Sequence, residues 1–232
     1  MSTVRFMILG KYPLDLDGNE LLEALREAFE SKDGKVPVKD RTYFHFIRNT
    51  ATMKDLNAEA TAIEHFVKQL PPIKTASHYF GGIGVSASIV RTLLPKIKQQ
   101  AIDIAEDCVV CLRRQGHTAV VDDSLKHWDK YVADLCILDF NTFSLLHKDN
   151  DTVDWRAVSG ILAHPKSRYM ITLDTACAKY RLNQATYKRR LGVKDLPNYR
   201  LLWKKTLAEM GWNILDQRHN RNADVMLLGR SQ

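Results

Sequence analysis

The chain has 232 residues, of which 45% are hydrophobic and 26% are charged. These proportions are those of a folded protein and exclude wholesale disorder. No apolar run reaches the roughly 18 to 20 residues that a membrane-spanning helix needs, and residues 6–10 are too short for a signal-peptide core. We therefore expect an intracellular protein that has no membrane partner.

The net charge of +7 is concentrated in the last third of the chain. Residues 1–150 contain 19 basic and 20 acidic side chains, a balance of −1, and residues 151–232 contain 15 and 7, a balance of +8. The two balances sum to the whole +7. This asymmetry indicates a polyanion-binding part attached to a near-neutral part.

The first 50 residues predict a strand, a helix and a second strand. Residues 3–10 (TVRFMILG) are apolar enough for a buried first strand. Asp17 is placed as the cap of an amphipathic helix over residues 20–31. Residues 41–48 are rich in aromatic and β-branched side chains, which is typical of a strand.

Two helices are predicted next, joined by a glycine-rich turn. Asn57 caps the first helix, which Pro71 and Pro72 stop. Its inward side chains are Ile63, Phe66, Val67 and Leu70. After the turn at residues 79–88 (YFGGIGVSAS), apolar positions at helical spacing run from residue 90 to residue 112, with Pro95 as a kink or a fresh start.

The next segment completes a layered α/β domain over residues 1–150. Gly116 closes the long helix, and residues 117–123 form a strand. Residues 124–147 fit either one long helix or a helix plus a strand. The polar, turn-prone residues 148–154 mark a domain boundary, because the charge balance also changes there.

Two short motifs in this domain have both a chemical and a structural interpretation. The glycines of residues 81–84 could cradle a phosphate at a helix N-terminus, but without the lysine of a phosphate-binding loop a plain tight turn is favoured. Cys108 and Cys111 have zinc-ligand spacing but no second pair of ligands, so we expect buried free cysteines and no metal.

The basic segment begins with three short predicted helices. The first covers residues 155–163 and ends before Pro165, and the second covers residues 173–180 with Thr172 as its cap. A break at residues 181–183 leads to the third helix, residues 184–191. This arrangement resembles a helix-turn-helix, although Arg181 stands where that motif usually has glycine.

The last elements extend the resemblance to a winged helix over residues 155–230. A helix over residues 197–210 ends at Gly211, and strands at residues 212–217 and 223–229 form a hairpin with a basic tip. In winged-helix domains this hairpin, the wing, lies along the nucleic-acid backbone. Strict spacing favours residues 184–191 as the recognition helix, whereas the position of the wing favours residues 197–210.

The resemblance implies a set of side chains that contact nucleic acid. Arginine and lysine suit phosphate and guanine, and small residues let a helix approach a groove closely. The predicted contact residues are Arg181, Ala185, Thr186, Lys188, Arg189, Arg190, Arg200, Lys204, Arg218 and Arg221.

Carboxylates after predicted strands support an alternative, a metal-dependent nuclease. Asp15, Asp17, Asp122 and Asp139 are the candidates, because acidic groups at strand ends can hold Mg²⁺ for phosphodiester cleavage. Residues 15–29 are similar to the opening of PIN-like or NYN-type ribonucleases. The structural interpretation is that Asp17 caps a helix and Asp139 interrupts one.

The sequence thus predicts a non-enzymatic nucleic-acid-binding protein that needs no cofactor. Its basic C-terminal domain, residues 151–232, would bind duplex DNA in preference to RNA. Its N-terminal α/β domain would mediate self-association or partner binding. Two alternatives stay open: the nuclease, which would use Mg²⁺, and a module that binds an acidic protein.

Overall fold

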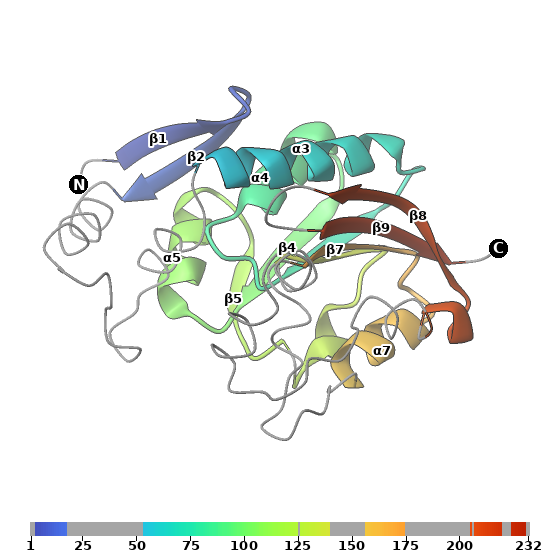
Figure 1. Ribbon diagram of the computed structural model, residues 1–232. Helices are drawn as coiled ribbons and strands as arrows, with labels where there is room; N and C mark the ends of the chain where they lie inside the picture. Colours follow the sequence, from blue (N-terminus) through green and yellow to red (C-terminus); the bar gives the residue numbers. More distant parts are fainter. Residues whose placement is uncertain are drawn as a thin grey trace, which may run out of the picture.

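The structure is a computed structural model that describes residues 3–17, 53–124, 126–139, 156–174, 205, 207–219 and 224–230 (Figure 1). Within these residues, seven strands form one sheet. They are β3 (Thr75–Tyr79), β4 (Lys98–Asp103), β5 (Ala119–Val121), β6 (Leu135–Leu138), β7 (Tyr169–Asp174), β8 (Trp212–His219) and β9 (Asp224–Arg230). The predicted α/β class is confirmed.

The sheet has the strand order β5-β4-β3-β6-β7-β9-β8. Strands β3 to β7 pair in parallel with one another, and β9 lies antiparallel between β7 and β8. The chain leaves β3 toward β4 and β5 on one side and later returns to place β6 and β7 on the other. The order therefore reverses between β3 and β6.

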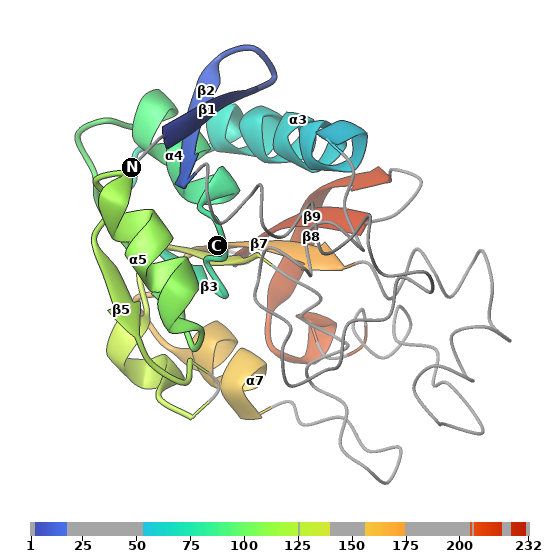
Figure 2. The ribbon, with the colours of Figure 1, turned by 90° about the vertical axis from the view of Figure 1, so that its left-hand side faces the viewer.

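Helices cover both faces of this sheet (Figures 1 and 2). The described helices are α3 (Met53–Gln69), α4 (Val85–Leu93), α5 (Glu106–Arg114), α7 (Arg156–Ala163) and the short 3₁₀ helix η2 (Trp128–Tyr131). In both views α3 and α4 lie on one face and α7 on the other. Of the helices in the described parts of the chain, none combines the length and the apolar character that crossing a bilayer requires.

Alternate residues of the central strands supply two separate cores. Leu135 and Ile137 of β6 pack with α3, whereas Cys136 and Leu138 pack with α7. This follows from the two-residue period of a strand, whose successive side chains point to opposite faces. Both faces of β6 are buried, so the strand is apolar at every position.

The N-terminal strand is real but does not join the large sheet. β1 (Thr3–Ile8) pairs with β2 (Tyr12–Asp17) in a separate two-stranded hairpin that lies beside α3 and α4 (Figures 1 and 2). Ile8, Tyr12 and Leu14 are buried against the α3 core, while the side chains at alternate positions of β1 are exposed. The predicted buried first strand is therefore an amphipathic hairpin strand.

Polar contacts hold this hairpin on α3. The helix begins at Met53, so Asn57 is inside it rather than at its cap, and its Oδ1 accepts a 3.0 Å hydrogen bond from Leu9 N in the hairpin turn. Lys11 Nζ lies 3.0 Å from Glu64 Oε1, and Lys68 donates to the same carboxylate. The hydrogen bond from Lys68 lowers the pKa of Glu64 to about 2 against the opposing effect of burial, and Lys11 adds to the lowering.

Acid should therefore loosen the hairpin through Glu64. Because its folded-state pKa lies below the unfolded value, the carboxylate stabilises the fold above pH 4.5 and loses that contribution as pH falls toward 2. We expect Glu64→Gln to lower the melting temperature at pH 7 and to converge with the wild type near pH 2. Thermal melts from pH 7 to pH 2 measure this, and a gap that is constant over the range would contradict the assignment.

The predicted helix over residues 90–112 is wrong. The chain instead forms α4, which ends at Leu93 two residues before Pro95, then strand β4, then α5. Ile104 fits the helical spacing but is 70% exposed, while Ala101 faces a small core with Leu112. Pairing of β4 with β3 and β5 decides the outcome, because those hydrogen bonds come from residues distant in sequence.

The prediction of a winged-helix domain is also wrong. Residues 172–174, predicted to cap and begin a helix, are the end of β7 and pair with β6 and β9. The C-terminal hairpin exists as β8 and β9, but β9 is inserted beside β7 in the large sheet instead of projecting as a wing. Buried Thr172 and Leu173 belong to that sheet, since their backbone groups are paired on its ladder.

Other predictions have mixed outcomes. The helix at residues 155–163, the strand within residues 117–123 and the inward face of α3 at Ile63, Phe66 and Val67 are confirmed. The segment over residues 124–147 contains η2 and β6 within its described part. The predicted helix at 20–31, the strand at 41–48 and the domain boundary at 148–154 lie outside the described residues, although the sheet draws strands from both sides of that boundary.

Candidate functional site

The carboxyl ends of β3 to β6 meet at one edge of the sheet, and chemically active groups gather there. Parallel α/β sheets bind ligands at this edge, where the strand order reverses. In this chain the reversal lies between β3 and β6. The segments that follow β3, β4, β5 and β6 contribute a glycine-rich turn, Asp103, Asp122 and Asp139, respectively.

The turn after β3 brings the backbone unusually close to its neighbours. Gly84 is the N-cap of α4 and has φ +90°, a left-handed conformation that favours glycine. A Cβ placed on Gly84 would lie 2.8 Å from Leu112 Cδ2, and one on Gly81 would lie 3.0 Å from Ala101 Cβ. The glycines are therefore required for packing against β4 and α5, and they bring the start of α4 to the sheet edge.

Asp103, the last residue of β4, fixes this turn. Its Oδ2 accepts a 2.9 Å hydrogen bond from Gly82 N, and its Oδ1 accepts one of 2.9 Å from Ala105 N. Burial raises the pKa of Asp103, whereas these backbone hydrogen bonds act to lower it. Each carboxylate oxygen has two acceptor positions, so the carboxylate can still accept a hydrogen bond from a ligand. The next residue, Ile104, presents an exposed apolar side chain at the same edge.

Asp122 lies at the neighbouring position, directly after β5. Its carboxylate accepts hydrogen bonds from the Tyr131 hydroxyl and, at 2.7 Å, from His127 Nδ1. These bonds, led by that from Tyr131, hold the pKa of Asp122 well below its usual range. Asp122 is thus an ionised group that ties η2 to the end of β5.

Asp139 follows β6 and belongs to a buried polar chain. The Ser86 hydroxyl, on the first turn of α4, donates to Asp139 Oδ2, and His78 Nδ1 lies 2.8 Å from Ser86 Oγ. The Asp139 backbone N donates to Tyr79 O at 3.0 Å. Burial raises the pKa of Asp139, while His78 and Ser86 oppose that effect. A carboxyl group with a raised pKa beside a glycine-rich turn is suited to proton transfer.

The four candidate carboxylates for metal binding do not form one cluster. Asp15 and Asp17 are on β2, in the separate hairpin, where Arg5 Nε lies 2.6 Å from Asp15 Oδ1. Asp122 and Asp139 follow β5 and β6, which are three strand spacings apart, or about 14 Å. Within the described ranges no three His, Cys, Asp or Glu side chains come together as metal ligands.

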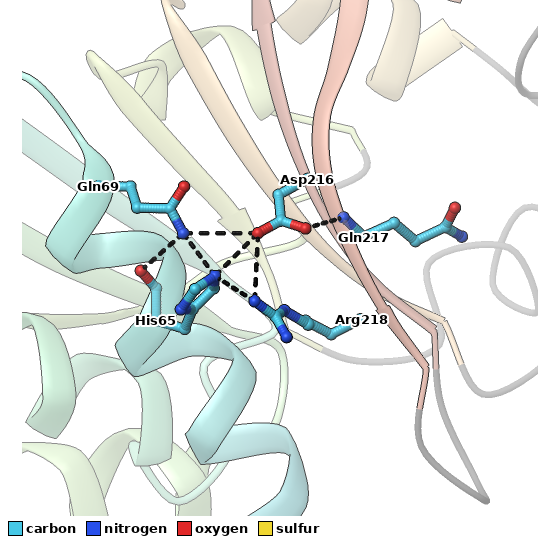
Figure 3. A network of polar contacts seen from close by, with 5 residues as sticks. All are labelled: His65, Gln69, Asp216, Gln217 and Arg218. Atoms are coloured by element: carbon cyan, nitrogen blue, oxygen red, sulfur yellow. Dashed lines mark hydrogen bonds and ion pairs between the residues drawn. The ribbon is translucent and has the colours of Figure 1, made fainter.

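Arg218, predicted as a wing contact, lies in an intramolecular network (Figure 3). Its Nη2 is 2.6 Å from His65 Nε2 and 3.7 Å from Asp216 Oδ2, and His65 Nε2 is 2.9 Å from Asp216 Oδ2. Gln69 donates to Asp216 at 3.4 Å from the next turn of α3. The network joins α3 to the outer strand β8, so Arg218 has a structural partner within the fold.

The remaining predicted contacts lie outside the described residues. They are Arg181, Ala185, Thr186, Lys188, Arg189, Arg190, Arg200, Lys204 and Arg221. The prediction of buried free cysteines is confirmed for Cys108 and Cys111, and Cys136 is a buried free cysteine as well.

Asp103 is the functional candidate that sequence reasoning missed. It lies 21 residues after Gly82, close to the spacing at which an acidic residue follows a glycine-rich turn in dinucleotide-binding folds. The false helix over residues 90–112 hid this relation, because it placed Asp103 on a helix surface. A predicted strand that ends at Asp103 would have indicated that its carboxylate lies beside the glycine-rich turn.

Several solved structures with a similar fold are methyltransferases. An rRNA methylase from Escherichia coli is 15% identical with a TM-score of 0.53, covering 93% of this chain and 78% of the other. The 16S rRNA methylase RmtB is 15% identical with a TM-score of 0.52, covering 97% and 78%. Human N-acetylserotonin methyltransferase in complex with SAM is 17% identical with a TM-score of 0.53, covering 92% and 66%. No protein-family model matches the chain, and no curated protein matches its sequence.

At these identities the similarity establishes the fold alone. That fold, with an antiparallel β9 inserted beside β7, overturns the winged-helix resemblance of residues 155–230. The predicted function built on it, a helix-turn-helix DNA-binding protein, is therefore wrong. The nuclease alternative, which rested on a carboxylate cluster, is also wrong, because the similar folds are those of methyltransferases and the described carboxylates do not come together. Duplex DNA as the partner is not supported, and the acidic-protein alternative is set aside with them.

Proposed function

We propose that the protein is an S-adenosylmethionine-dependent methyltransferase whose substrate is RNA. The observation that supports it most strongly is one hydrogen bond between the ends of two strands. Gly82 N, in the turn after β3, donates to the carboxylate of Asp103 at the end of β4. This hydrogen bond lies beside the reversal of strand order, in a fold similar to that of known methyltransferases. In place of the expected absence of a cofactor, we propose S-adenosylmethionine.

The residues at the sheet edge fit the parts of that cofactor. The spare acceptor positions of Asp103 suit ribose hydroxyls, which donate hydrogen bonds. Ile104 is 70% exposed and offers an apolar surface for a purine ring. The close glycine turn allows a ligand to approach the backbone at the start of α4. When bound, the cofactor supplies an electrophilic methyl group on its sulfonium sulfur.

Asp139 is the residue that we assign to the substrate side. It follows β6, immediately across the strand-order reversal from the glycine turn. Ser86 occupies Oδ2, which leaves Oδ1 to accept the proton that a nucleophilic nitrogen or oxygen loses on methylation. Burial, which raises the pKa of Asp139, makes the carboxylate a better proton acceptor.

Two observations favour RNA as the substrate class. Residues 151–232 hold an excess of eight positive charges, which suits a polyanionic substrate. Two of the similar structures are rRNA methylases. The excess positive charge of residues 151–232 therefore supports RNA, in place of duplex DNA, as the partner.

A transfer assay with the full chain tests the proposal. Tritium-labelled S-adenosylmethionine is supplied with unmodified transcribed rRNA, with DNA of the same sequence, or with protein, and binding of the cofactor is measured by calorimetry. We expect label in RNA alone and a micromolar dissociation constant. Asp139→Asn should abolish transfer while cofactor binding is retained. Asp129→Asn, a matched change at an exposed neighbouring aspartate, should leave both intact.

The outcomes separate the two parts of the proposal. Absence of cofactor binding at millimolar concentration would overturn the methyltransferase assignment. Binding with label transferred only to protein or to a small acceptor would overturn RNA as the substrate.

A further inference from the structure

A cavity lies at the opposite edge of the sheet from the candidate methyl-transfer site. It has a volume of about 580 Å³, within the range of small-molecule sites. The first residues of β3 and β4 and the segments that lead into β5, β6 and β7 surround it. Parallel strands of five or six residues separate the two edges by about 17 to 20 Å. The cavity is therefore distinct from the site formed by Asp103 and Asp139.

The charge of this cavity is positive throughout. Arg91, Lys98 and Lys166 line it, and its described lining contains no aspartate or glutamate. The three cations come from the end of α4, the start of β4 and the segment before β7. Cations brought together from three separate elements, with no carboxylate among them, create a focused positive potential in a concave site.

Among the described residues neither Lys98 nor Lys166 forms an ion pair. Asp134, the aspartate that precedes β6 at this edge, is directed at backbone donors: its Oδ2 accepts from Lys74 N at 2.8 Å and from Thr75 N at 2.9 Å. Arg91 uses Nη1 for Gln115 O at 2.6 Å, and four further N–H donors of its guanidinium remain.

Neutral hydrogen-bonding groups complete the lining. Thr75, Ser77, Gln99, Gln100 and Thr118 contribute hydroxyl and amide groups. His117 is 7% exposed, its Nδ1 has no hydrogen-bond partner, and burial lowers its pKa to about 4. It is therefore neutral at pH 7 and serves as a polar rather than a charged wall of the cavity. Polar donors around three cations match the many acceptor oxygens of a phosphate group.

We propose that this amino-edge cavity is a binding site for a small phosphorylated molecule, whose phosphate groups are held by the cations that line it, Arg91, Lys98 and Lys166. A small molecule suits the site better than a nucleic-acid strand, because the cations line a hollow whose back wall contains buried Ser77 and His117. The site does not depend on the proposed methyl transfer.

Calorimetric titration with inorganic pyrophosphate tests the site on the full chain at constant ionic strength. We expect one saturable site, and Lys98→Gln combined with Lys166→Gln should weaken it by about 10- to 100-fold. Lys126→Gln combined with Lys205→Gln removes the same charge at exposed positions away from the cavity and should leave the affinity unchanged. Both lysine pairs are at the surface, so the melting temperatures should stay close to the wild type.

Three results would overturn the proposal. The first is no saturable binding of pyrophosphate by the wild type, and the second is equal weakening by the two double variants. The third comes from a parallel titration with a single-stranded RNA 10-mer. If Lys98→Gln with Lys166→Gln weakens the RNA and leaves pyrophosphate unaffected, the cavity contacts a nucleic-acid backbone instead.

Discussion

Replacing Asp103 with alanine is expected to weaken the binding of S-adenosylmethionine by about 100-fold or more. A hydrogen bond to a charged group is worth about 1.5 to 3 kcal/mol, and the carboxylate has positions for two ribose hydroxyls. The change also removes the acceptors of Gly82 N and Ala105 N, which shape the turn after β3. Calorimetry with the purified cofactor measures the loss, and circular dichroism checks that the fold is retained.

Two further variants make this result specific. Asp15→Ala removes an aspartate on the separate hairpin and should change the affinity by less than twofold, because its described partner is Arg5. Ile104→Ala truncates a side chain that is 70% exposed, so folding is unaffected, and loss of contact with the purine should weaken binding by about tenfold. Unchanged affinity in both Asp103→Ala and Ile104→Ala would place the cofactor elsewhere.

The second large effect is expected for Gly84→Ala, which should lower the free energy of unfolding by about 3 kcal/mol. The left-handed φ of +90° disfavours any residue with a Cβ, and that Cβ would lie 2.8 Å from Leu112 Cδ2. Leu112 is fully buried, so it has little room to move. The start of α4 should shift away from α5, and cofactor binding should weaken with it. Urea denaturation measures the stability.

Gly211→Ala separates the strain of a left-handed backbone from the clash of the added Cβ with Leu112. Gly211 has φ +71°, but its added Cβ would meet nothing within 4 Å, so only the conformational strain of about 1 kcal/mol applies. We expect Gly84→Ala to be clearly the more destabilising of the two, and Gly211→Ala to leave cofactor binding unchanged. Equal destabilisation would show that contact with Leu112 has no part in the effect.

The sequence predicted those elements whose signals are local. Helix α7 ends before Pro165, and the inward face of α3 follows the spacing of Ile63, Phe66 and Val67. Strand β5 and the hairpin of β8 and β9 were also recognisable, because turn residues bound each strand. The excess charge of residues 151–232 is likewise a property of the sequence alone.

The candidate site was less accessible to sequence reasoning. Asp122 and Asp139 were recognised as acids after strands, but the glycine turn was read as structural and Asp103 was overlooked. Residues 97–104 place apolar side chains at helical spacing, and only pairing with β3 and β5 turns them into β4. The site becomes visible once β4 exists, since its last residue then lies beside Gly82.

Only the tertiary structure therefore decided where each element lies in the fold. A hairpin with a basic tip is equally compatible with a projecting wing and with the edge of a sheet. The choice depends on whether β9 pairs with β7, whose partner residues lie 50 to 60 positions earlier in the chain. Likewise Thr172 and Leu173 suit the start of a helix until pairing with β6 and β9 makes them a strand. Hydrogen bonds between distant segments fix such choices, and local periodicity does not encode them.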